Sequence, residues 1–482
     1  MNLPHAPDRV IAIVGAGFSG VALAVQLLQQ LREPTRIVLL GQPDSYGRGL
    51  AYGTPSAQHL LNVPAGRMGM DPAHESGFSD YLLRRGLAFG PADFVPRSIY
   101  GDYLASCLDA AQQAALPGVV LERRPADVLR ITRSQGSSDS PGRQLDLGDG
   151  SRLEADQVVL ATGNFASLPP PVASHLDWTR APLFGNPWSA MDLSPLPAAG
   201  DILLVGSGLT AMDMVLQLVD QGHTGKIVMV SRRGQLAKAH RHHDAAPRSD
   251  WIEANFGAGE TQVRVLLREL RRRIAGAKAQ GGDWRDVMGS LRSQTARLWQ
   301  QLSRRSKAQF VRHLGPYWDV HRHRAAPEVG ERMQKLMQSG QVLLLAGNMT
   351  RFELGQDGHV EVSIRGRGQS GLRHAVFKAA INCIGPCADL TRLAHPLIQQ
   401  LLAAGDIVPD ALRLGLECSE GYALRDARGH TQRDLYYLGP FLKASYWEAT
   451  AVPELRVHAR ALARQIADTA PSHAAQAGLA VA

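Results

Sequence analysis

The apolar positions near the start of the chain predict a strand, a helix and a second strand in that order. The continuous apolar run Val10–Val14 ends at Gly15, and Val21–Leu31 follows with the pattern of an apolar helix. A second apolar run covers Arg36–Leu40. Short apolar runs rich in β-branched residues are typical of parallel strands that are buried on both faces. The chain is therefore expected to begin with a parallel strand–helix–strand unit.

The same order of elements returns in the middle of the chain. Strand patterns cover Asp201–Val205 and Lys226–Val230, and a helix is expected between them over Thr210–Gln221. Two such units in one chain predict an α/β fold with two Rossmann-like dinucleotide-binding domains.

The segments around these two units carry further patterns. A proline-bearing connector is expected over Ala166–Pro197, and a basic, mainly helical insertion over Glu260–Leu314. A final helix is expected from about Val452 to Ala467. Additional strands are expected at Val119–Glu122, Gln144–Leu147, Val158–Ala161, Val342–Leu345, His359–Val362, Ala375–Ile384 and Tyr436–Leu438.

Charge adds one feature to this picture, because it is concentrated in one segment. The 482 residues carry 52 Lys and Arg against 44 Asp and Glu, a net charge of +8. A count over residues 235–324 gives 18 Lys and Arg against 8 Asp and Glu, so this segment holds the whole excess. It indicates either an anionic partner, such as an acidic substrate, a phosphate-bearing cofactor, nucleic acid or a membrane face, or a solvated basic helical face.

Composition otherwise excludes several classes of protein. The content of hydrophobic residues, 44%, is ordinary for a folded protein. Four cysteines exclude a disulfide scaffold and fit a reducing compartment. No apolar run approaches the roughly 18 residues of a membrane span, and Met1–Arg9 lacks the pattern of a signal peptide. A soluble, cytoplasmic, multi-domain protein is expected.

The first strand leads directly into a glycine motif, Gly15-Ala-Gly-Phe-Ser-Gly20. In G-x-G-x-x-G motifs the first glycine permits the tight turn, the second lets a pyrophosphate approach the backbone, and the third lets helix and strand pack closely. One element of the pattern is missing, because no acidic residue directly ends the second strand. Either Gln42 or Asp44 replaces it, or the ribose is held less tightly.

The second unit carries the variant Gly206-Ser-Gly-Leu-Thr-Ala211. Its second strand ends in Ser231, Arg232 and Arg233 rather than in a carboxylate. A carboxylate would repel a 2′-phosphate, whereas arginine can bind it with two hydrogen bonds. This favours NADP over NAD, unless the arginines only cap a surface strand. The turns Ala161-Thr-Gly163 and Asn382–Gly385 are short and individually uninformative. They resemble turns that pass the nucleotide in flavoproteins with two dinucleotide domains, and this resemblance supports FAD at the first site and NADPH at the second.

Longer motifs carry a resemblance that spans nearly the whole chain. The sequence resembles a family of bacterial FAD/NAD(P)-binding proteins, which is similar in layout to class B flavin monooxygenases, including ornithine and lysine N-hydroxylases. Characterised relatives include bacterial enzymes that N-oxidise L-aspartate to nitrosuccinate. The motifs are Gly47–Thr54, Leu61–Met68, Phe94–Arg97, Tyr100–Tyr103, Tyr317–Pro327 and Tyr446–Arg456.

The resemblance implies an FAD-dependent, NADPH-using monooxygenase that N-oxygenates a small amine or amino acid through a C4a-hydroperoxyflavin, with molecular oxygen as co-substrate. An anionic amino acid is the expected substrate. A nucleic-acid partner and a membrane are not favoured, and a homo-oligomer stays open. Three alternatives stay open: an NADPH-dependent flavin oxidoreductase without oxygen insertion, an RNA-binding flavoprotein, and a regulatory or sensor protein that holds FAD without turnover.

The expected domains follow this layout. They are an FAD-binding domain at 1–185, an NADPH-binding domain at 186–385 with a helical insertion at about 240–325, the C-terminal part of the FAD-binding domain at 386–470, and a flexible tail at 471–482.

The candidate site residues fall into three groups. Asn62, His321 and His323 are expected to be catalytic, with histidine as the proton acceptor. Arg322, Arg324 and Trp447 are expected at the substrate. No metal is expected, because the clusters at His321–Arg324 and at His240, His242 and His243 lack ligand partners at a recognised spacing. The expected cofactor-binding residues are Gly15, Gly17, Phe18, Ser19, Gly20, Gln42, Arg48, Asn62, Val63, Arg67, Val128, Ala161, Thr162, Gly163, Gly206, Ser207, Gly208, Leu209, Thr210, Arg232, Arg233, Gly439 and Val452.

Overall fold

The chain forms two compact units in its computed structural model. Unit 1 comprises Met1–Pro55, Pro64–Phe165 and Ala388–Ala482, and unit 2 comprises Ser56–Val63 and Ala166–Cys387. The expected tail at 471–482 lies outside the described residues, as do His242 and His243. The described residues are 9–54, 56–134, 142–188, 196, 198–241, 250–257, 259 and 261–469.

Unit 1 is built on a six-stranded sheet with the order β15-β16-β7-β1-β2-β3. All neighbouring strands are parallel except β15 and β16, which pair antiparallel. The central strand is apolar on both faces, and its residues Ile11, Ala12 and Ile13 are fully buried. The strands are β1 Arg9–Val14, β2 Thr35–Leu40, β3 Val119–Arg124, β7 Gln157–Leu160, β15 Ala423–Arg425 and β16 Thr431–Tyr437.

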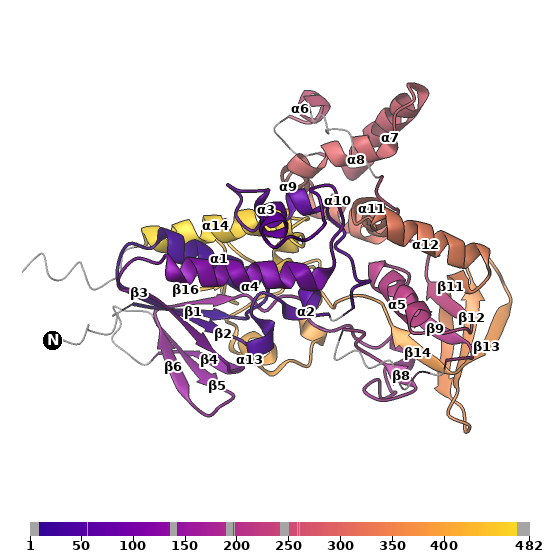
Figure 1. The fold of residues 1–482 in the computed structure, drawn as a ribbon, viewed down its shortest axis with the longest axis horizontal. Coiled ribbons are helices and arrows are strands. Elements are labelled where there is room, and N and C mark those ends of the chain that lie inside the picture. Colours follow the sequence, from indigo (N-terminus) through magenta and orange to yellow (C-terminus); the bar gives the residue numbers. More distant parts are fainter. Residues whose placement is uncertain are drawn as a thin grey trace, which may run out of the picture. The chain divides into compact units, whose positions relative to one another are not determined.

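Helices cover one face of this sheet, and a small antiparallel sheet lies on the other (Figure 1). Helix α1 packs against both α4 and α14, while α13 packs on strand β4 of the small sheet, whose order is β4-β5-β6. The helices are α1 Phe18–Gln30, α2 Gly49–Tyr52, α3 Gly77–Arg84, α4 Arg97–Gln113, α13 Pro396–Ala404 and α14 Val452–Asp468. The small sheet contains β4 Val128–Arg133, β5 Arg143–Leu147 and β6 Arg152–Ala155.

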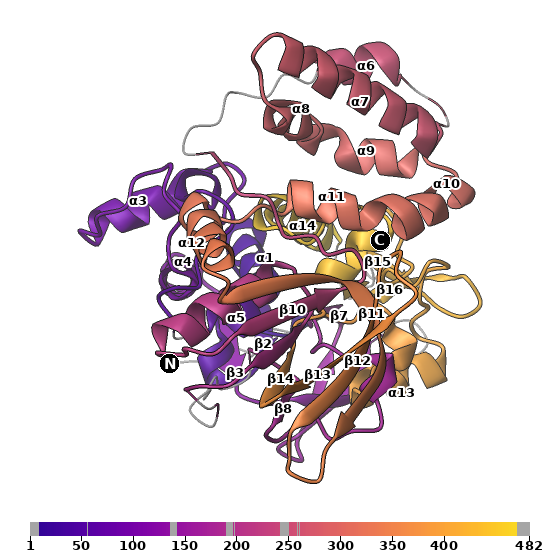
Figure 2. The same ribbon diagram turned by 90° about the vertical axis from the view of Figure 1, so that its right-hand side faces the viewer.

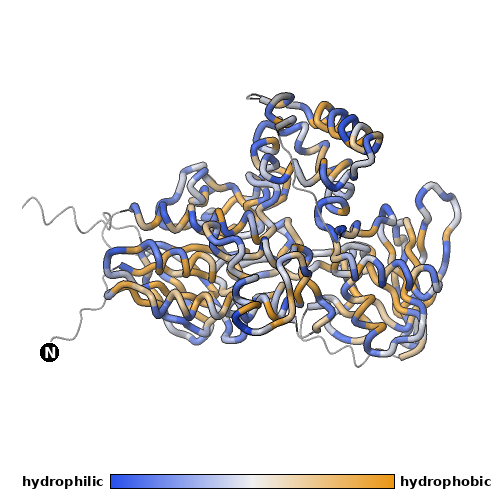
Figure 3. Tube along the Cα trace, turned by 45° about the horizontal axis from the view of Figure 1, so that its top comes forward, coloured by the Kyte–Doolittle hydropathy of each residue, from blue (hydrophilic) through white to orange (hydrophobic). Residues whose placement is uncertain are grey.

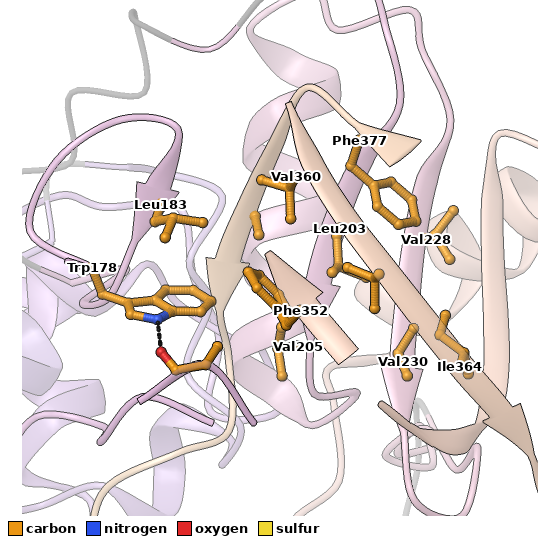
Figure 4. Packing of buried hydrophobic residues seen from close by; sticks show 13 residues of the cluster. Trp178, Leu183, Leu203, Val205, Val228, Val230, Phe352, Val360, Ile364 and Phe377 are labelled. Atoms are coloured by element: carbon orange, nitrogen blue, oxygen red, sulfur yellow. Dashed lines mark hydrogen bonds between the residues drawn. The ribbon is translucent and has the colours of Figure 1, made fainter. Parts of the chain in front are cut away.

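Unit 2 is built on a seven-stranded sheet with the order β13-β12-β11-β10-β9-β14-β8. Its core includes Trp178, whose indole N–H donates to the carbonyl of Ala173 at 3.0 Å and whose ring lies 5.4 Å from that of Phe352 (Figure 4). Leu203 and Val205 of β9 lie in the same cluster. The strands are β8 Leu183–Phe184, β9 Ile202–Val205, β10 Ile227–Ser231, β11 Val342–Leu354, β12 Val360–Gly366, β13 Leu372–Phe377 and β14 Ala379–Asn382.

Helices α5 and α12 flank the sheet of unit 2, and the described residues of the predicted insertion form six further helices. Helices α5 and α12 contact each other, and α12 contacts β11. The helices of the insertion gather side by side in both ribbon views (Figures 1 and 2), around Ile252, Phe256, Met288, Leu291 and Leu298. The bounds are α5 Leu209–Asp220, α6 Asp250–Asn255, α7 Val263–Ala279, α8 Trp284–Ser290, α9 Thr295–Gln300, α10 Arg304–Gln309, α11 Gly315–Arg322 and α12 Pro327–Gln338.

The predicted α/β class with two Rossmann-like domains is confirmed by this topology. Hydrophobic stretches run along the central strands, and hydrophobic and hydrophilic turns alternate in the insertion (Figure 3). Within the described ranges, no helix is both long enough and apolar enough to cross a membrane.

Three details differ from the expectations. The prediction of a single strand at Ala375–Ile384 is wrong, because this segment contributes to two strands at different places in the sheet. β13 pairs antiparallel with β12 at one edge, whereas β14 pairs in parallel with β9 and β8. The apolar pattern does not predict the short strands β4, β6 and β8. The contact pattern changes after Phe165 and after Cys387, rather than at the expected boundaries 185/186 and 385/386, and it assigns Ser56–Val63 to unit 2.

Candidate functional site

The first glycine motif lies at the point in the unit 1 sheet where the strand order reverses. β1 lies between β2 and β7, and the carboxyl ends of all three strands meet at one edge. The backbone N–H of Gly15 donates to the carbonyl of Leu40 at 2.9 Å, and that of Ala161 donates to the carbonyl of Val14 at 2.8 Å. Such a crevice is where open parallel sheets bind ligands.

Gly15 itself cannot carry a side chain. Its φ is +113°, and a Cβ built there would lie 2.4 Å from the carbonyl oxygen of Ala161. Glycine is therefore required at this position because the backbone of the turn at Ala161–Gly163 leaves no room for a side chain. This is the turn that is predicted to lie at FAD.

The space beside this turn fits a dinucleotide. Gly17 caps α1, and a Cβ there would meet only the Cα of Gly49, at an ordinary 3.7 Å. A Cβ on Gly163 would meet nothing within 4 Å. The first turn of the 13-residue helix α1 contains no acidic residue, so its N-terminus can receive a phosphate. Phe18, Ser19 and Gly20 form this turn and are buried.

The C-terminal part of unit 1 meets the same edge. Leu438 N–H donates to the carbonyl of Leu160 at 3.0 Å, because β16 runs beside β7. The buried Tyr437 hydroxyl hydrogen-bonds Thr162 and accepts the N–H of Phe441 at 3.2 Å. Burial raises the pKa of this hydroxyl, so it stays protonated. The structure thus brings Thr162 and the Gly439 turn together, and Tyr437 joins them.

The position of the missing acidic residue is polar and exposed. Gln42 caps a short 3₁₀ turn at Pro43–Ser45, and Ser45 Oγ donates to the carbonyl of Gln42 at 2.6 Å. Asp44 lies in the first turn of the same element. Both side chains are exposed, so both candidates for the ribose contact stay open.

The other residues of unit 1 that are expected to contact FAD differ in their burial and in their contacts within the protein. Arg48 pairs with Asp102 at 2.6 Å, and both side chains are about half exposed. Arg67 is exposed, whereas Val128 and Val452 are buried at the starts of β4 and α14. Their roles as cofactor contacts stay predictions.

Unit 2 repeats the glycine geometry of unit 1. Gly206 N–H donates to the carbonyl of Val230, and Cys383 N–H donates to that of Val205, both at 2.8 Å. Gly206 has φ +123°, and a Cβ there would lie 2.3 Å from the carbonyl oxygen of Cys383. A Cβ on Gly208, which caps α5, would meet nothing within 4 Å. Leu209 and Thr210 follow in the first turn, so this cradle also fits a dinucleotide.

Arg232 and Arg233, which follow β10, differ in their surroundings, although both are predicted to bind the coenzyme. Arg232 is exposed. Arg233 donates from Nη2 to the carbonyl of Arg312 at 3.1 Å, and its Cζ lies 5.2 Å from the ring centroid of Tyr317. Arg233 is therefore engaged with the insertion, and Arg232 is the better candidate for a phosphate.

Serine hydroxyls occupy the place of an acidic residue beside Arg232. Ser207 Oγ lies 2.6 Å from the carbonyl of Gln235 and 2.7 Å from Ser231 Oγ, which accepts the N–H of Gly234 at 3.1 Å. Because a carbonyl only accepts, Ser207 donates to Gln235 and Ser231 donates to Ser207. The network is neutral and does not repel a phosphate.

Asn62 and Val63 lie in unit 2, although the sequence treats them with Arg67 as one loop. The carbonyl of Asn62 accepts from His240 Nε2 at 3.1 Å. The backbone N–H of His240 donates to the carbonyl of Ala325 at 2.9 Å. The structure therefore brings Asn62 close to the segment after His321–Arg324. His240 is a site residue that the sequence leaves without a role; its only signal is its place in a histidine cluster.

The expected catalytic histidines lie at the C-terminal end of α11. A π-helical segment at Phe310–Leu314 connects α10 directly to α11. His321 Nδ1 lies 2.7 Å from the carbonyl of Tyr317, and its ring meets Trp284 edge to face at 4.8 Å. His323 Nε2 lies 3.9 Å from Asp319. Since a carbonyl only accepts, His321 carries its proton on Nδ1, and Nε2 is left as the acceptor.

The expected substrate residues are more buried than a surface site requires. Arg324 is 8% exposed and Trp447 is 5% exposed, while Arg322 is half-buried. Lys443 Nζ lies 4.1 Å from the ring centroid of Trp447 in unit 1. Their contacts with a substrate stay predictions.

Metal and disulfide chemistry find no support in the part of the chain that the structure describes. No group of three or more His, Cys, Asp or Glu side chains is arranged there to hold a metal ion. The four cysteines, all of them in described segments, form no disulfide. Burial raises the pKa of the Cys383 and Cys418 thiols, and that of Cys418 reaches about 12.

A histidine on α14 predicts how unit 1 responds to pH. His458 Nδ1 lies 3.0 Å from the hydroxyl of Tyr422, and its ring lies 4.7 Å from that of Tyr446. Burial lowers the pKa of His458 to about 4. An unfolded histidine titrates near 6.5, so the unfolded chain takes up a proton first as the pH falls. Stability is therefore fully present above about pH 6.5 and falls by about 3 kcal/mol towards pH 4.

This loss can be measured by chemical denaturation of the purified protein between pH 7 and pH 4, with FAD absent. We expect His458→Gln, which cannot take up the proton, to flatten the dependence by about 3 kcal/mol. His430→Gln changes an exposed histidine and serves as the control. Equal pH slopes in wild type and His458→Gln would contradict the prediction.

Comparisons with known proteins agree with this architecture. Residues 12–165 match the model of a protein family described as FAD-NAD(P)-binding. No curated protein matches the sequence.

Solved structures that match nearly the full length of the chain include three amine or amino-acid oxygenases. L-lysine 6-monooxygenase from Pseudomonas syringae is 15% identical with a TM-score of 0.61, over 96% of this chain and 100% of that one. Ornithine N-hydroxylase from Kutzneria sp. 744 is 14% identical with a TM-score of 0.61, over 95% and 98%. Ornithine hydroxylase from Pseudomonas aeruginosa is 18% identical with a TM-score of 0.59, over 95% and 98%. At these identities the likeness is one of fold.

Proposed function

We propose that this protein is an FAD- and NADPH-dependent monooxygenase that oxygenates the nitrogen of a small amine or amino acid. The observation that carries the proposal is the repeated glycine cradle, with Gly15 and Gly206 each closed against the turn of a neighbouring strand. Two cradles in one chain fit one dinucleotide for each unit. The full-length likeness to enzymes that hydroxylate ornithine or oxygenate lysine supports the choice of reaction, and the Kutzneria structure holds reduced FAD, NADP⁺ and L-ornithine.

The chemistry supplied by bound FAD is the activation of O₂ after reduction by NADPH. For each amine converted to a hydroxylamine, one NADPH, one proton and one O₂ are consumed, and NADP⁺ and water are formed. The N-termini of α1 and α5 hold the two pyrophosphates. His321 Nε2 accepts a proton from the ammonium form of the substrate, because only the neutral amine is a nucleophile.

For the substrate we propose an anionic amino acid. The basic charge of the insertion and the arginines Arg322 and Arg324 support this class, since guanidinium groups bind carboxylates with two hydrogen bonds.

The experiment that tests the proposal measures the products of O₂ reduction by the FAD-loaded protein. NADPH consumption, hydroxylamine and hydrogen peroxide are measured together with L-aspartate, L-ornithine, L-lysine and cadaverine as trial substrates. Hydroxylamine formed in step with NADPH consumption is expected for at least one of them. Peroxide alone with every amine would instead favour a flavin oxidoreductase without oxygen insertion, and a protein that binds no FAD would overturn the proposal.

The two arginines after β10 predict coenzyme preference. We expect Arg232→Ala to raise the KM for NADPH about 10- to 100-fold, which is the worth of a hydrogen bond to a charged group, and to leave the KM for NADH unchanged. Arg233→Ala is the matched control, because Arg233 is already engaged with Arg312 and Tyr317. Steady-state reduction of bound flavin by each coenzyme checks this. A switch in preference caused by Arg233→Ala but not by Arg232→Ala would contradict it.

A further inference from the structure

We propose that Arg456 is a positioning residue that joins the segment Arg67–Glu75 to α14 and so determines how tightly unit 1 holds FAD. The inference rests on the proposed function, because it concerns the same cofactor. It assigns a role to a residue whose hydrogen bonds go to Arg67, Gly69 and Glu75.

The contacts of Arg456 point away from its own helix. Its side chain is 3% exposed. Nη1 donates to the carbonyl of Gly69 at 2.7 Å and, more weakly, to that of Arg67 at 3.4 Å. Nη2 donates to the carboxylate of Glu75. One guanidinium group therefore binds three acceptors along a single segment of chain, for which its planar array of donors is suited.

Further contacts hold the segment that Arg456 binds. Gly69 N–H donates to the carbonyl of Glu75 at 3.0 Å, and a Cβ on Gly69 would lie 2.2 Å from the carbonyl oxygen of His74. Met70 N–H donates to the Tyr103 hydroxyl of α4 at 3.1 Å. Burial raises the pKa of Tyr103, so the hydroxyl stays neutral. The segment is thus fixed from α4 on one side and from α14 on the other.

Helix stability does not account for an arginine at this place. Arg456 lies four residues after Val452, the first residue of α14, which is about 6 Å along the axis. This is beyond the first turn, so the helix dipole gives the cation no stabilisation there. Its pairing with Glu75 adds little, because the Glu75 side chain is 64% exposed. The hydrogen bonds to the carbonyls of Arg67 and Gly69 are what the position provides.

Both elements that Arg456 joins are expected to face FAD. Arg67 is exposed at one end of the segment, where its charge can balance that of the cofactor. The N-terminus of α14 begins at Val452, whose backbone N–H can face the cofactor. Pro453 has no N–H, and those of Glu454 and Leu455 donate to the carbonyl of Ala451. Loss of Arg456 releases one element from the other, and FAD must then order them at its own cost in binding free energy.

The test compares Arg456→Gln and Arg456→Lys with Arg460→Gln, which changes an exposed arginine one turn further along α14. The dissociation constant of FAD is measured by fluorescence titration of the FAD-free protein, and the Tm of the FAD-free protein is measured in parallel. We expect Arg456→Gln to weaken FAD binding about tenfold or more, Arg456→Lys to weaken it less, and Arg460→Gln to leave it unchanged. Hydrogen exchange of residues 67–75 is expected to rise in Arg456→Gln.

Several outcomes would overturn the inference. Unchanged FAD affinity in Arg456→Gln and Arg456→Lys is one. Another is weaker FAD binding that is accompanied by a matching fall in the Tm of the FAD-free protein, since Arg456 would then be only a structural residue. If Arg456→Gln does not fold, Arg456→Lys decides the matter alone. A wild-type protein that binds no FAD would instead contradict the proposed function, so the two failures are distinguishable.

Discussion

Replacing Gly15 by alanine is expected to abolish FAD binding by unit 1. The new Cβ would lie 2.4 Å from the carbonyl oxygen and 2.8 Å from the carbonyl carbon of Ala161, and both atoms belong to backbone that follows a central strand. The residue would also keep a φ of +113°, which disfavours any side chain. The turn at Ala161–Gly163 must shift, and with it the edge of the sheet at which the cofactor is expected.

A matched variant separates the close contact from the backbone conformation. Gly150, in the turn before β6, has φ +82°, and a Cβ there would meet nothing within 4 Å. Gly150→Ala should therefore cost only about 1–2 kcal/mol of strain and retain FAD. The flavin content of the purified proteins, read from absorbance, should fall at least about tenfold for Gly15→Ala alone.

The same substitution in unit 2 supplies a second comparison. We expect Gly206→Ala, whose Cβ would lie 2.3 Å from the carbonyl oxygen of Cys383, to retain FAD but lose reduction by NADPH. Chemical reduction by dithionite should still reduce the flavin. Full FAD occupancy in Gly15→Ala, or normal NADPH reduction in Gly206→Ala, would show that these turns are not the cofactor cradles.

Replacing Arg143 by methionine is expected to destabilise unit 1 by about 3–5 kcal/mol, as when one partner of a buried ion pair is removed. Arg143 is fully buried and donates to Asp434 at 2.7 and 3.1 Å and to Gln432 at 2.6 Å, while its Nη1 lies 3.2 Å from Asp406. Burial alone would lower the pKa of Arg143, but the two carboxylates raise it above its ordinary value, so the group stays charged. Methionine leaves Asp434 without this partner and leaves Asp406 only the more distant Arg133, whose Nε lies 4.0 Å away.

An exposed arginine of the same small sheet provides the control for this variant. Chemical denaturation of wild type, Arg143→Met and Arg152→Ala checks the prediction. Arg152 is 73% exposed beside Asp146, and its loss should change stability by less than about 1 kcal/mol. A loss of similar size in both variants would contradict the assignment.

The features that the sequence predicts well are those set by a few neighbouring residues. The two glycine motifs have the expected strand and helix on either side because a tight turn between them requires glycine within a short window. The central strands are also recognisable, since strands buried on both faces are apolar throughout. Strands β4 and β6 carry several exposed polar residues, so their pattern does not stand out from a loop.

The features that the sequence does not reveal depend on partners far along the chain. Arg232 and Arg233 are neighbours with the same chemistry, and the contacts of Arg233 with Arg312 and Tyr317 distinguish them. Nothing beside His240 indicates that its ring meets the carbonyl of Asn62, 178 residues away. Arg456 closes the motif Tyr446–Arg456, but its partners are nearly 400 residues earlier.

The discontinuity of unit 1 has a consequence for how the protein is made. Strand β16 completes the sheet beside β7, and Asp434 lies 291 residues after the Arg143 that it neutralises. At about 5–20 residues per second, a ribosome needs about 15–60 s to synthesise that interval. Ala166–Cys387, nearly all of unit 2, is translated within it. Unit 2 can therefore fold on the ribosome before the last strand of unit 1 has been synthesised. During this time β7 of unit 1 has an unpaired edge, which chaperones can shield.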